Sequence, residues 1–136
     1  MLKLPFLPVI LVAGVSLSSC VSTTTDGVRQ QKYHATAVSG ERTRIGRDWS
    51  VNPDCSRRGD PSVRVLQGPH HGKLDIIRED VFPYWKGGKC NSRKVLGNAQ
   101  YYTSDRGFIG TDSVVTRSSY GTGSVQDSTT EINVVK

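Results

Sequence analysis

The three cysteines are the residues whose types and spacing suggest chemistry most directly. Cys20 closes an N-terminal apolar segment that predicts export, which leaves Cys55 and Cys90 as an even pair. In the oxidising compartment outside the cytoplasm, such a pair in a small domain predicts a disulfide. Neither cysteine lies in a Cys-x-x-Cys motif, so the sequence favours neither a redox pair nor a zinc site.

Other groups that could bind metals or catalyse reactions are isolated. His70 and His71 are adjacent in a Pro-His-His-Gly turn. A histidine pair in such a turn is typically exposed and has no specific role, although it could form a contact that changes as the pH falls. Asp75 and Asp112 are the nearest candidates for calcium, but calcium takes about six to eight oxygens and the acidic residues are scattered. No Gly-x-Ser-x-Gly or His-Glu-x-x-His motif is present. We therefore expect no metal, no cofactor and no catalysis.

An aromatic and basic loop is the best candidate for a binding surface. It holds Phe82, Tyr84, Trp85, Lys86 and Lys89. Aromatic rings beside lysines suit contacts with sugars, peptides or membranes. They suit equally a loop that folds back over the core and is pinned by the nearby cysteine.

Arginines precede this loop, and the chain has a formal net charge of +6. They are Arg42, Arg44, Arg47, Arg57, Arg58 and Arg64. A basic balance favours anionic neighbours, although a solvated face that keeps the domain soluble is the simpler interpretation. We add Arg57 and Arg58 to the candidate binding surface.

The N-terminus predicts a lipid anchor. Residues 1–19 combine one lysine, an apolar run and small residues, which is typical of a secretory signal peptide and too short for a membrane span. Residues 17–20, Leu-Ser-Ser-Cys, resemble the bacterial lipobox, which implies that Cys20 is acylated. Val21 stands where an aspartate would signal inner-membrane retention, so we expect the outer membrane, facing the periplasm. Residues 20–40 are polar and predict a flexible linker, within which residues 34–39 could form an edge strand.

Composition predicts the class of the remaining domain, residues 41–136. With 14 glycines, 6 prolines and no helical period, the sequence favours an all-β fold with many turns. Residues 62–66 and 73–78 alternate and predict a hairpin that turns through residues 67–72. Residues 113–120 and 129–135 predict a closing pair of strands. Trp49 is expected in the core.

Two motifs resemble the bacterial cadherin-like and Ig-like repeat domains. Residues 69–74 read Pro-His-His-Gly-Lys-Leu, and Tyr102 precedes Gly-Phe-x-Gly-x-Asp-Ser at residues 107–113. The resemblance covers roughly residues 60–135 and implies an Ig-like β-sandwich of about seven short strands. At the second motif, we expect Asp112 to cap the turn by accepting backbone N–H bonds.

These features together predict a lipid-anchored structural or interaction domain of the bacterial cell envelope, without catalysis. Its expected partners are the membrane, through the anchor, and another envelope protein or an anionic glycan; an exported chain does not point to nucleic acid. The alternative is a lipoprotein inhibitor or ligand-binding module, similar in size and disulfide use to the bacterial inhibitors of lysozyme.

Overall fold

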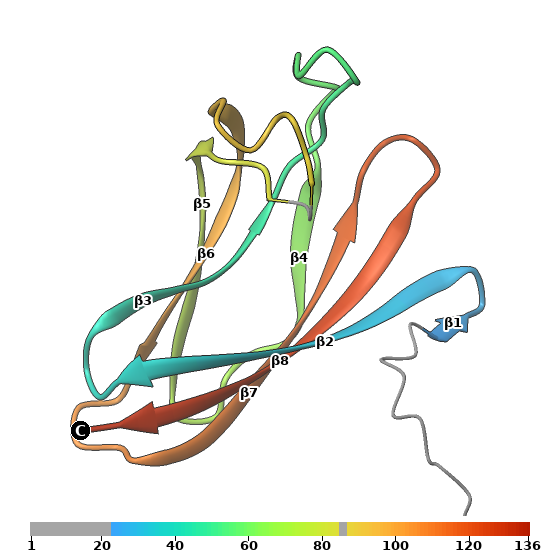
Figure 1. Cartoon of the computed structure of the whole chain (residues 1–136). Coiled ribbons are helices and arrows are strands. Elements are labelled where there is room, and N and C mark those ends of the chain that lie inside the picture. Colours follow the sequence, from blue (N-terminus) through green and yellow to red (C-terminus); the bar gives the residue numbers. More distant parts are fainter. Residues whose placement is uncertain (1–22, 85–86) are drawn as a thin grey trace, which may run out of the picture.

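The computed structural model describes residues 23–84 and 87–136, which form two β-sheets packed as a sandwich (Figure 1). The strands are β1 (Thr23–Thr25), β2 (Val28–Val38), β3 (Arg42–Asp48), β4 (Ser62–Gln67), β5 (Gly72–Val81), β6 (Val95–Ser104), β7 (Gly110–Ser119) and β8 (Val125–Val135). The order is β1-β2-β8-β7-β4 in the five-stranded sheet and β3-β6-β5 in the three-stranded sheet. The predicted all-β sandwich is confirmed, with eight strands in the described part.

The pairing of the strands combines antiparallel ladders with one parallel ladder. β7 and β8 pair antiparallel, as the sequence predicts for the closing strands. β2 pairs parallel with β8, from Arg29 opposite Gln126 to Val38 opposite Val135. In the other sheet, β3 carries an irregularity between Arg44 and Gly46 where it pairs with β6. This bulge bends an edge strand, which hinders pairing with another chain.

The prediction of a flexible linker over residues 20–40 is wrong for residues 23–38, because β1 and β2 lie there. The strand considered for residues 34–39 corresponds to the last part of β2, which lies between β1 and β8 and is not an edge strand. Residues 29–38 pair with β8, although Ala37 is the one buried side chain of β2. Backbone hydrogen bonds to a neighbouring strand hold this segment, and little apolar burial accompanies them. The polar composition of this segment therefore did not indicate that β2 lies between two other strands of the five-stranded sheet.

The predicted hairpin over residues 62–78 is also wrong. β4 pairs with β7 and β5 pairs with β6, so the chain crosses from one sheet to the other between them. The backbone N–H groups of His70 and His71 donate to the carboxylate of Asp112 on β7, each at 2.9 Å. A side chain of β7, the strand beside β4 in the five-stranded sheet, thus holds this connection in place of a ladder between β4 and β5.

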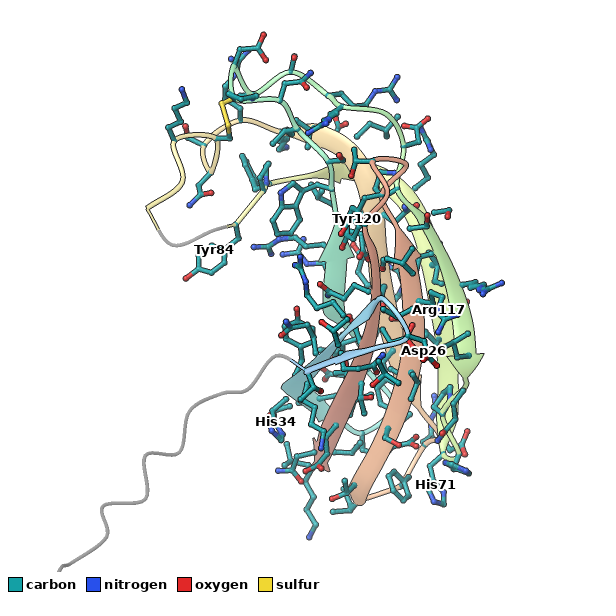
Figure 2. All side chains as sticks on the ribbon, turned by 90° about the vertical axis from the view of Figure 1, so that its right-hand side faces the viewer. Asp26, His34, His71, Tyr84, Arg117 and Tyr120 are labelled. Atoms are coloured by element: carbon teal, nitrogen blue, oxygen red, sulfur yellow. A yellow bond between two sulfur atoms is a disulfide. The ribbon has the colours of Figure 1, made fainter. Side chains whose placement is uncertain are left out.

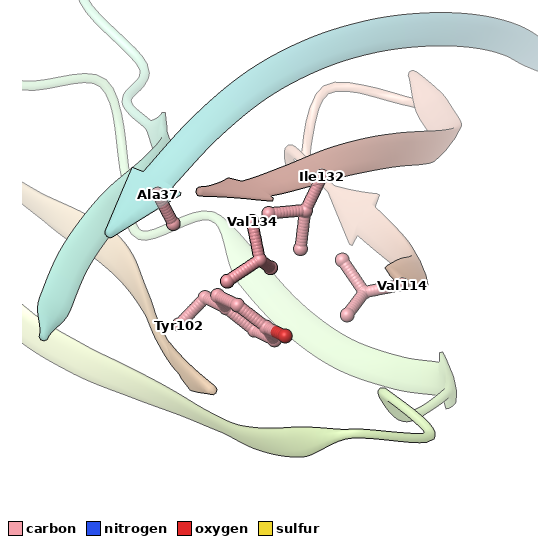
Figure 3. Close-up of a cluster of buried hydrophobic side chains, with 5 residues drawn as sticks. All are labelled: Ala37, Tyr102, Val114, Ile132 and Val134. Carbon is pink, nitrogen blue, oxygen red and sulfur yellow. The ribbon is translucent and has the colours of Figure 1, made fainter. Parts of the chain in front are cut away.

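The main hydrophobic cluster lies between the sheets, where both contribute side chains (Figure 3). Its fully buried members are Ala37, Tyr102, Val114, Ile132 and Val134. Burying a side chain of the size of valine or isoleucine stabilises a fold by about 1.5–3 kcal/mol. A cluster of this size gives the domain a small core, so other interactions matter for its stability.

A second cluster joins β5 and β6 to the segment that follows β3. It contains Val81, Val95 and Ala99, with Trp49 and Val51 packed against it. The prediction that Trp49 packs in the core is confirmed. Gly97 permits this packing, because a β carbon there would clash with the main-chain oxygen of Asp48 and lie 2.9 Å from Val81.

Asp112 organises the closed end of the sandwich, and the predicted capping role is confirmed. One oxygen accepts from the backbone N–H groups of His70 and Ser113, and the other accepts from His71 and from the Tyr102 hydroxyl at 2.8 Å. Burial by itself would raise the pKa of Asp112, but these donors hold the pKa below its ordinary value. The ionised carboxylate therefore stabilises the native state.

We expect Asp112→Asn to lower the free energy of unfolding by about 1–3 kcal/mol at pH 7, because an amide cannot accept all these bonds. The native pKa of Asp112 is depressed, so its contribution is present above the unfolded pKa, about pH 4, and is lost as the pH falls through the native pKa. Urea unfolding at pH 7 and pH 3 measures the difference, which should shrink in acid. Asp80→Asn, on an exposed residue of β5, is the matched control. An equal deficit at both pH values would contradict the assignment.

Candidate ligand-binding groove between the sheets

A groove of about 710 Å³ lies between the sheets beyond the main hydrophobic cluster. Figure 1 shows β2, β7 and β8 diverging from β3 and β6 towards this end. Strands β2 and β8 supply one wall, and β3 with the residues after it supplies the other. The charged and aromatic lining residues are Arg29, Tyr33, Arg44, Arg47, Asp48, Trp49, Arg58, Tyr84 and Tyr120. The volume falls in the range of small-ligand sites, about 300–1,000 Å³.

The groove exists because the inner face of the five-stranded sheet changes character along its strands. On β8, Val134 and Ile132 belong to the hydrophobic cluster, whereas Thr130 and Ser128 follow on the same face and line the groove. Thr116 and Ser118 continue β7 in the same way and are buried. Small hydroxyl side chains neither fill the space between sheets nor favour a dry interior, so the sheets separate there.

Asp48 lies in the groove at the end of β3, where its buried carboxylate joins the two sheets. It accepts from Gln100 of its own sheet at 2.8 Å and from Ser118 of the opposite sheet at 2.6 Å. The Tyr120 hydroxyl donates to the same carboxylate at 3.1 Å. Burial, and then the charge of Asp48, raise the pKa of Tyr120 well above its ordinary value, so this hydroxyl stays a donor.

Four arginines give the groove its charge: Arg29, Arg44, Arg47 and Arg58. Against the single carboxylate of Asp48, they leave a formal charge of +3 among the described lining residues. Within residues 23–84 and 87–136, none of the four forms an ion pair with a carboxylate. The groove is therefore a concentration of positive charge that the described part of the protein leaves uncompensated.

Arg47 is the most enclosed of the four. Its guanidinium lies 5.9 Å from the ring centre of Trp49 and 5.7 Å from that of Tyr84. Its Nε is buried and has no hydrogen-bond acceptor among the described residues. A buried N–H without an acceptor costs free energy.

The structure brings together some of the predicted binding residues. Arg58 and Tyr84 line the groove, and Figure 2 shows the Tyr84 ring projecting from the loop after β5. Phe82 is exposed outside the groove lining, with the ammonium of Lys94 5.4 Å from its ring centre, and Lys89 is exposed as well.

The remaining predicted residues have other settings. Arg57 is paired with Asp60 at 2.8 Å, and it shares this carboxylate with Arg78, so its charge is compensated in part. Trp85, Lys86 and the predicted lipidation residue Cys20 lie outside the described residues.

Sequence reasoning missed most of the groove. It noted Arg44 and Arg47 only as part of a solvated cluster, and it placed Arg29 and Tyr33 in a linker. The available signal was the replacement of apolar residues by threonine and serine on one face of residues 113–120 and 125–135. That change marks where a sandwich interior becomes polar.

The disulfide between Cys55 and Cys90 is confirmed, with 5.3 Å between the two Cα atoms. It joins the loop after β3 to the loop before β6. Arg58 follows the first cysteine closely and Tyr84 precedes the second, so the bond fixes two segments that reach the groove.

The histidines lie away from the groove. His71 stacks on Phe108 with 4.1 Å between ring centres, and the Nδ1 of His70 lies 4.0 Å from a carboxylate oxygen of Asp112. Within the described ranges, no group of three or more histidine, cysteine or acidic residues could hold a metal ion. The same ranges contain no helix of the length and apolarity that a membrane crossing requires.

Comparison with known proteins does not assign the chain to a family. No protein-family model matches the sequence, and no curated protein matches it. The resemblance to cadherin-like and Ig-like repeat domains stays a prediction, carried by the two motifs and compatible with the observed sandwich.

We expect the double substitution of Cys55 and Cys90 by serine to lower the free energy of unfolding by about 3–4 kcal/mol, because the bond closes a loop with a sequence separation of 35. Urea unfolding of the oxidised protein and the variant measures this difference. Wild-type protein treated with a reductant should match the variant. Equal midpoints for the oxidised protein and the variant would show that the loops hold without the bond.

Proposed function

We propose that this protein is a non-catalytic ligand-binding domain of the bacterial cell envelope, with the groove between its sheets as the site for an anionic ligand. The observation that carries this proposal is the set of four arginines around the groove, none of which has a carboxylate partner in the described part of the chain. This favours a ligand-binding module over a purely structural domain.

Two further features support an anionic ligand. The carboxylate of Asp48 is engaged by three hydrogen-bond donors of the protein, so it is not free to pair with the arginines. The guanidinium of Arg47 lies 5.9 Å from the ring centre of Trp49 and 5.7 Å from that of Tyr84, and this partly desolvated setting strengthens its attraction for an anion. Arginine suits this task because its guanidinium presents a planar fork of donors to carboxylate or phosphate oxygens.

We also propose that this domain does not catalyse a reaction. The described lining residues include no histidine, cysteine, lysine or glutamate that could act as nucleophile or general base. Asp48 is the single carboxylate among them, and its hydrogen bonds with Gln100 and Ser118 give it a structural role in joining the two sheets.

The proposed location is the periplasmic face of the outer membrane, with Cys20 as the lipid-bearing residue. The signal-like residues 1–19 and the lipobox-like residues 17–20 support it. The disulfide is in keeping with an oxidising compartment. An acylated cysteine bearing three chains exceeds the two signals that stable membrane anchoring needs.

The ligand site is tested with the full chain, expressed with its own leader and purified in detergent. Tripolyphosphate, tetraglutamate and trigalacturonate are titrated while tryptophan fluorescence is followed, because Trp49 lines the groove. We expect at least one of them to bind at low salt. Arg44→Gln and Arg58→Gln should each weaken that binding about five- to tenfold, which corresponds to about 1–1.4 kcal/mol.

Arg106→Gln serves as the matched control, since Arg106 is exposed on the connection between β6 and β7 and does not line the groove. It should leave affinity unchanged. Equal losses in all three variants would indicate a general charge effect and overturn the groove as the site.

The anchor is tested separately. We expect the protein to incorporate radioactive palmitate in growing bacteria and to sediment with membranes, and Cys20→Ala to abolish both, because the thiol carries the lipid. Ser19→Ala is the control that keeps the cysteine and a small residue before the cleavage site. Labelling of the Cys20→Ala chain would contradict the anchor.

A further inference from the structure

We propose that the ligand of the groove is a carboxylated oligosaccharide. This inference rests on the proposed function and names its ligand class.

The distribution of the charges indicates a ligand with several separated anionic groups. Arg29 comes from β2, Arg44 from β3 and Arg58 from the loop that follows Cys55. They therefore approach the groove from both walls and from its margin. A single compact anion contacts few of them at once, whereas a chain with a carboxylate on successive units can pair with several.

The aromatic residues indicate that the units of this chain are rings. Tyr84 is 68% exposed and Tyr33 is 47% exposed, and both line the groove from opposite walls. An exposed tyrosine offers a flat apolar face and a polar tip, which suits the C–H face and the hydroxyl groups of a sugar ring. The guanidinium of Arg47 lies 5.7 Å from the Tyr84 ring centre, so positive charge adjoins this face. A polyglutamate chain has carboxylates but no ring that could stack on these tyrosines.

The rest of the lining is rich in neutral hydrogen-bonding groups. Thr122, Ser124, Gln126 and Ser128 supply hydroxyls and amides along one side. Such groups match a ligand that carries many hydroxyls. Fatty-acyl chains would need a continuous apolar wall, whereas the described lining has only Ile45 and Val51 as aliphatic side chains.

The test compares trigalacturonate with its methyl ester, which keeps the rings and removes the charges, and with uncharged maltotriose. Using the full chain in detergent, we expect the acid to bind at least about tenfold tighter than either. Tyr84→Leu and Tyr33→Leu should each weaken trigalacturonate binding about five- to tenfold. Phe82→Leu is the matched control, because Phe82 is exposed on the same loop as Tyr84 but does not line the groove. Thermal unfolding verifies that all three variants are folded.

Three results would overturn the ligand class. One is that tripolyphosphate, tetraglutamate or tetrathymidylate binds more tightly than trigalacturonate and that this binding depends on Arg44. In that case the proposed anion site stands, but its ligand is not a carboxylated oligosaccharide. Another is equal affinity for the acid and its ester. The third is unchanged affinity in both folded tyrosine variants. If no anion binds in a manner that depends on Arg44, the proposed function fails together with this inference.

Discussion

The carboxylate of Asp48 holds the two sheets together where hydrophobic packing is absent. Gln100 donates to it from one sheet, and Ser118 and Tyr120 donate from the other sheet and its loop. A buried carboxylate is tolerated only while donors surround it, and a hydrogen bond to a charged group contributes about 1.5–3 kcal/mol. The reach of these hydrogen bonds also sets how far the sheets separate. The groove therefore has a defined width although its walls are polar.

Asp112 performs the corresponding task at the other end of the sandwich. Its carboxylate binds the connection between β4 and β5 and the hydroxyl of Tyr102, which belongs to the opposite sheet. Val114, Ile132 and Val134 pack in the hydrophobic cluster near Asp112, and their burial contributes favourable free energy. Apolar contacts of this kind are not directional, whereas hydrogen bonds to a carboxylate are. The core thus supplies stability, and the two carboxylates fix the alignment of the sheets.

Local chemistry made part of this structure predictable. Turn residues, alternating strands and the cysteine pair indicated the all-β class, the β7–β8 pair, the disulfide and the capping role of Asp112. The linker and the 62–78 hairpin were mispredicted because both depend on partners distant in sequence: β8 for β2, and β7 for β4. The groove was missed for the same reason. Arg29, Arg44 and Arg58 share no spacing that a sequence reveals, and only the divergence of the sheets brings them to one site.

The parallel ladder between β2 and β8 joins the first long strand of the domain to its last, and β8 is the middle strand of the five-stranded sheet. β1 can pair with β2, and β4 with β7, before β8 is available. The two parts of the large sheet can join only through β8, since β2 and β7 both pair with it. Long-range pairing of this kind slows folding. The topology consequently delays completion of the five-stranded sheet until the last residues of the chain are free to pair.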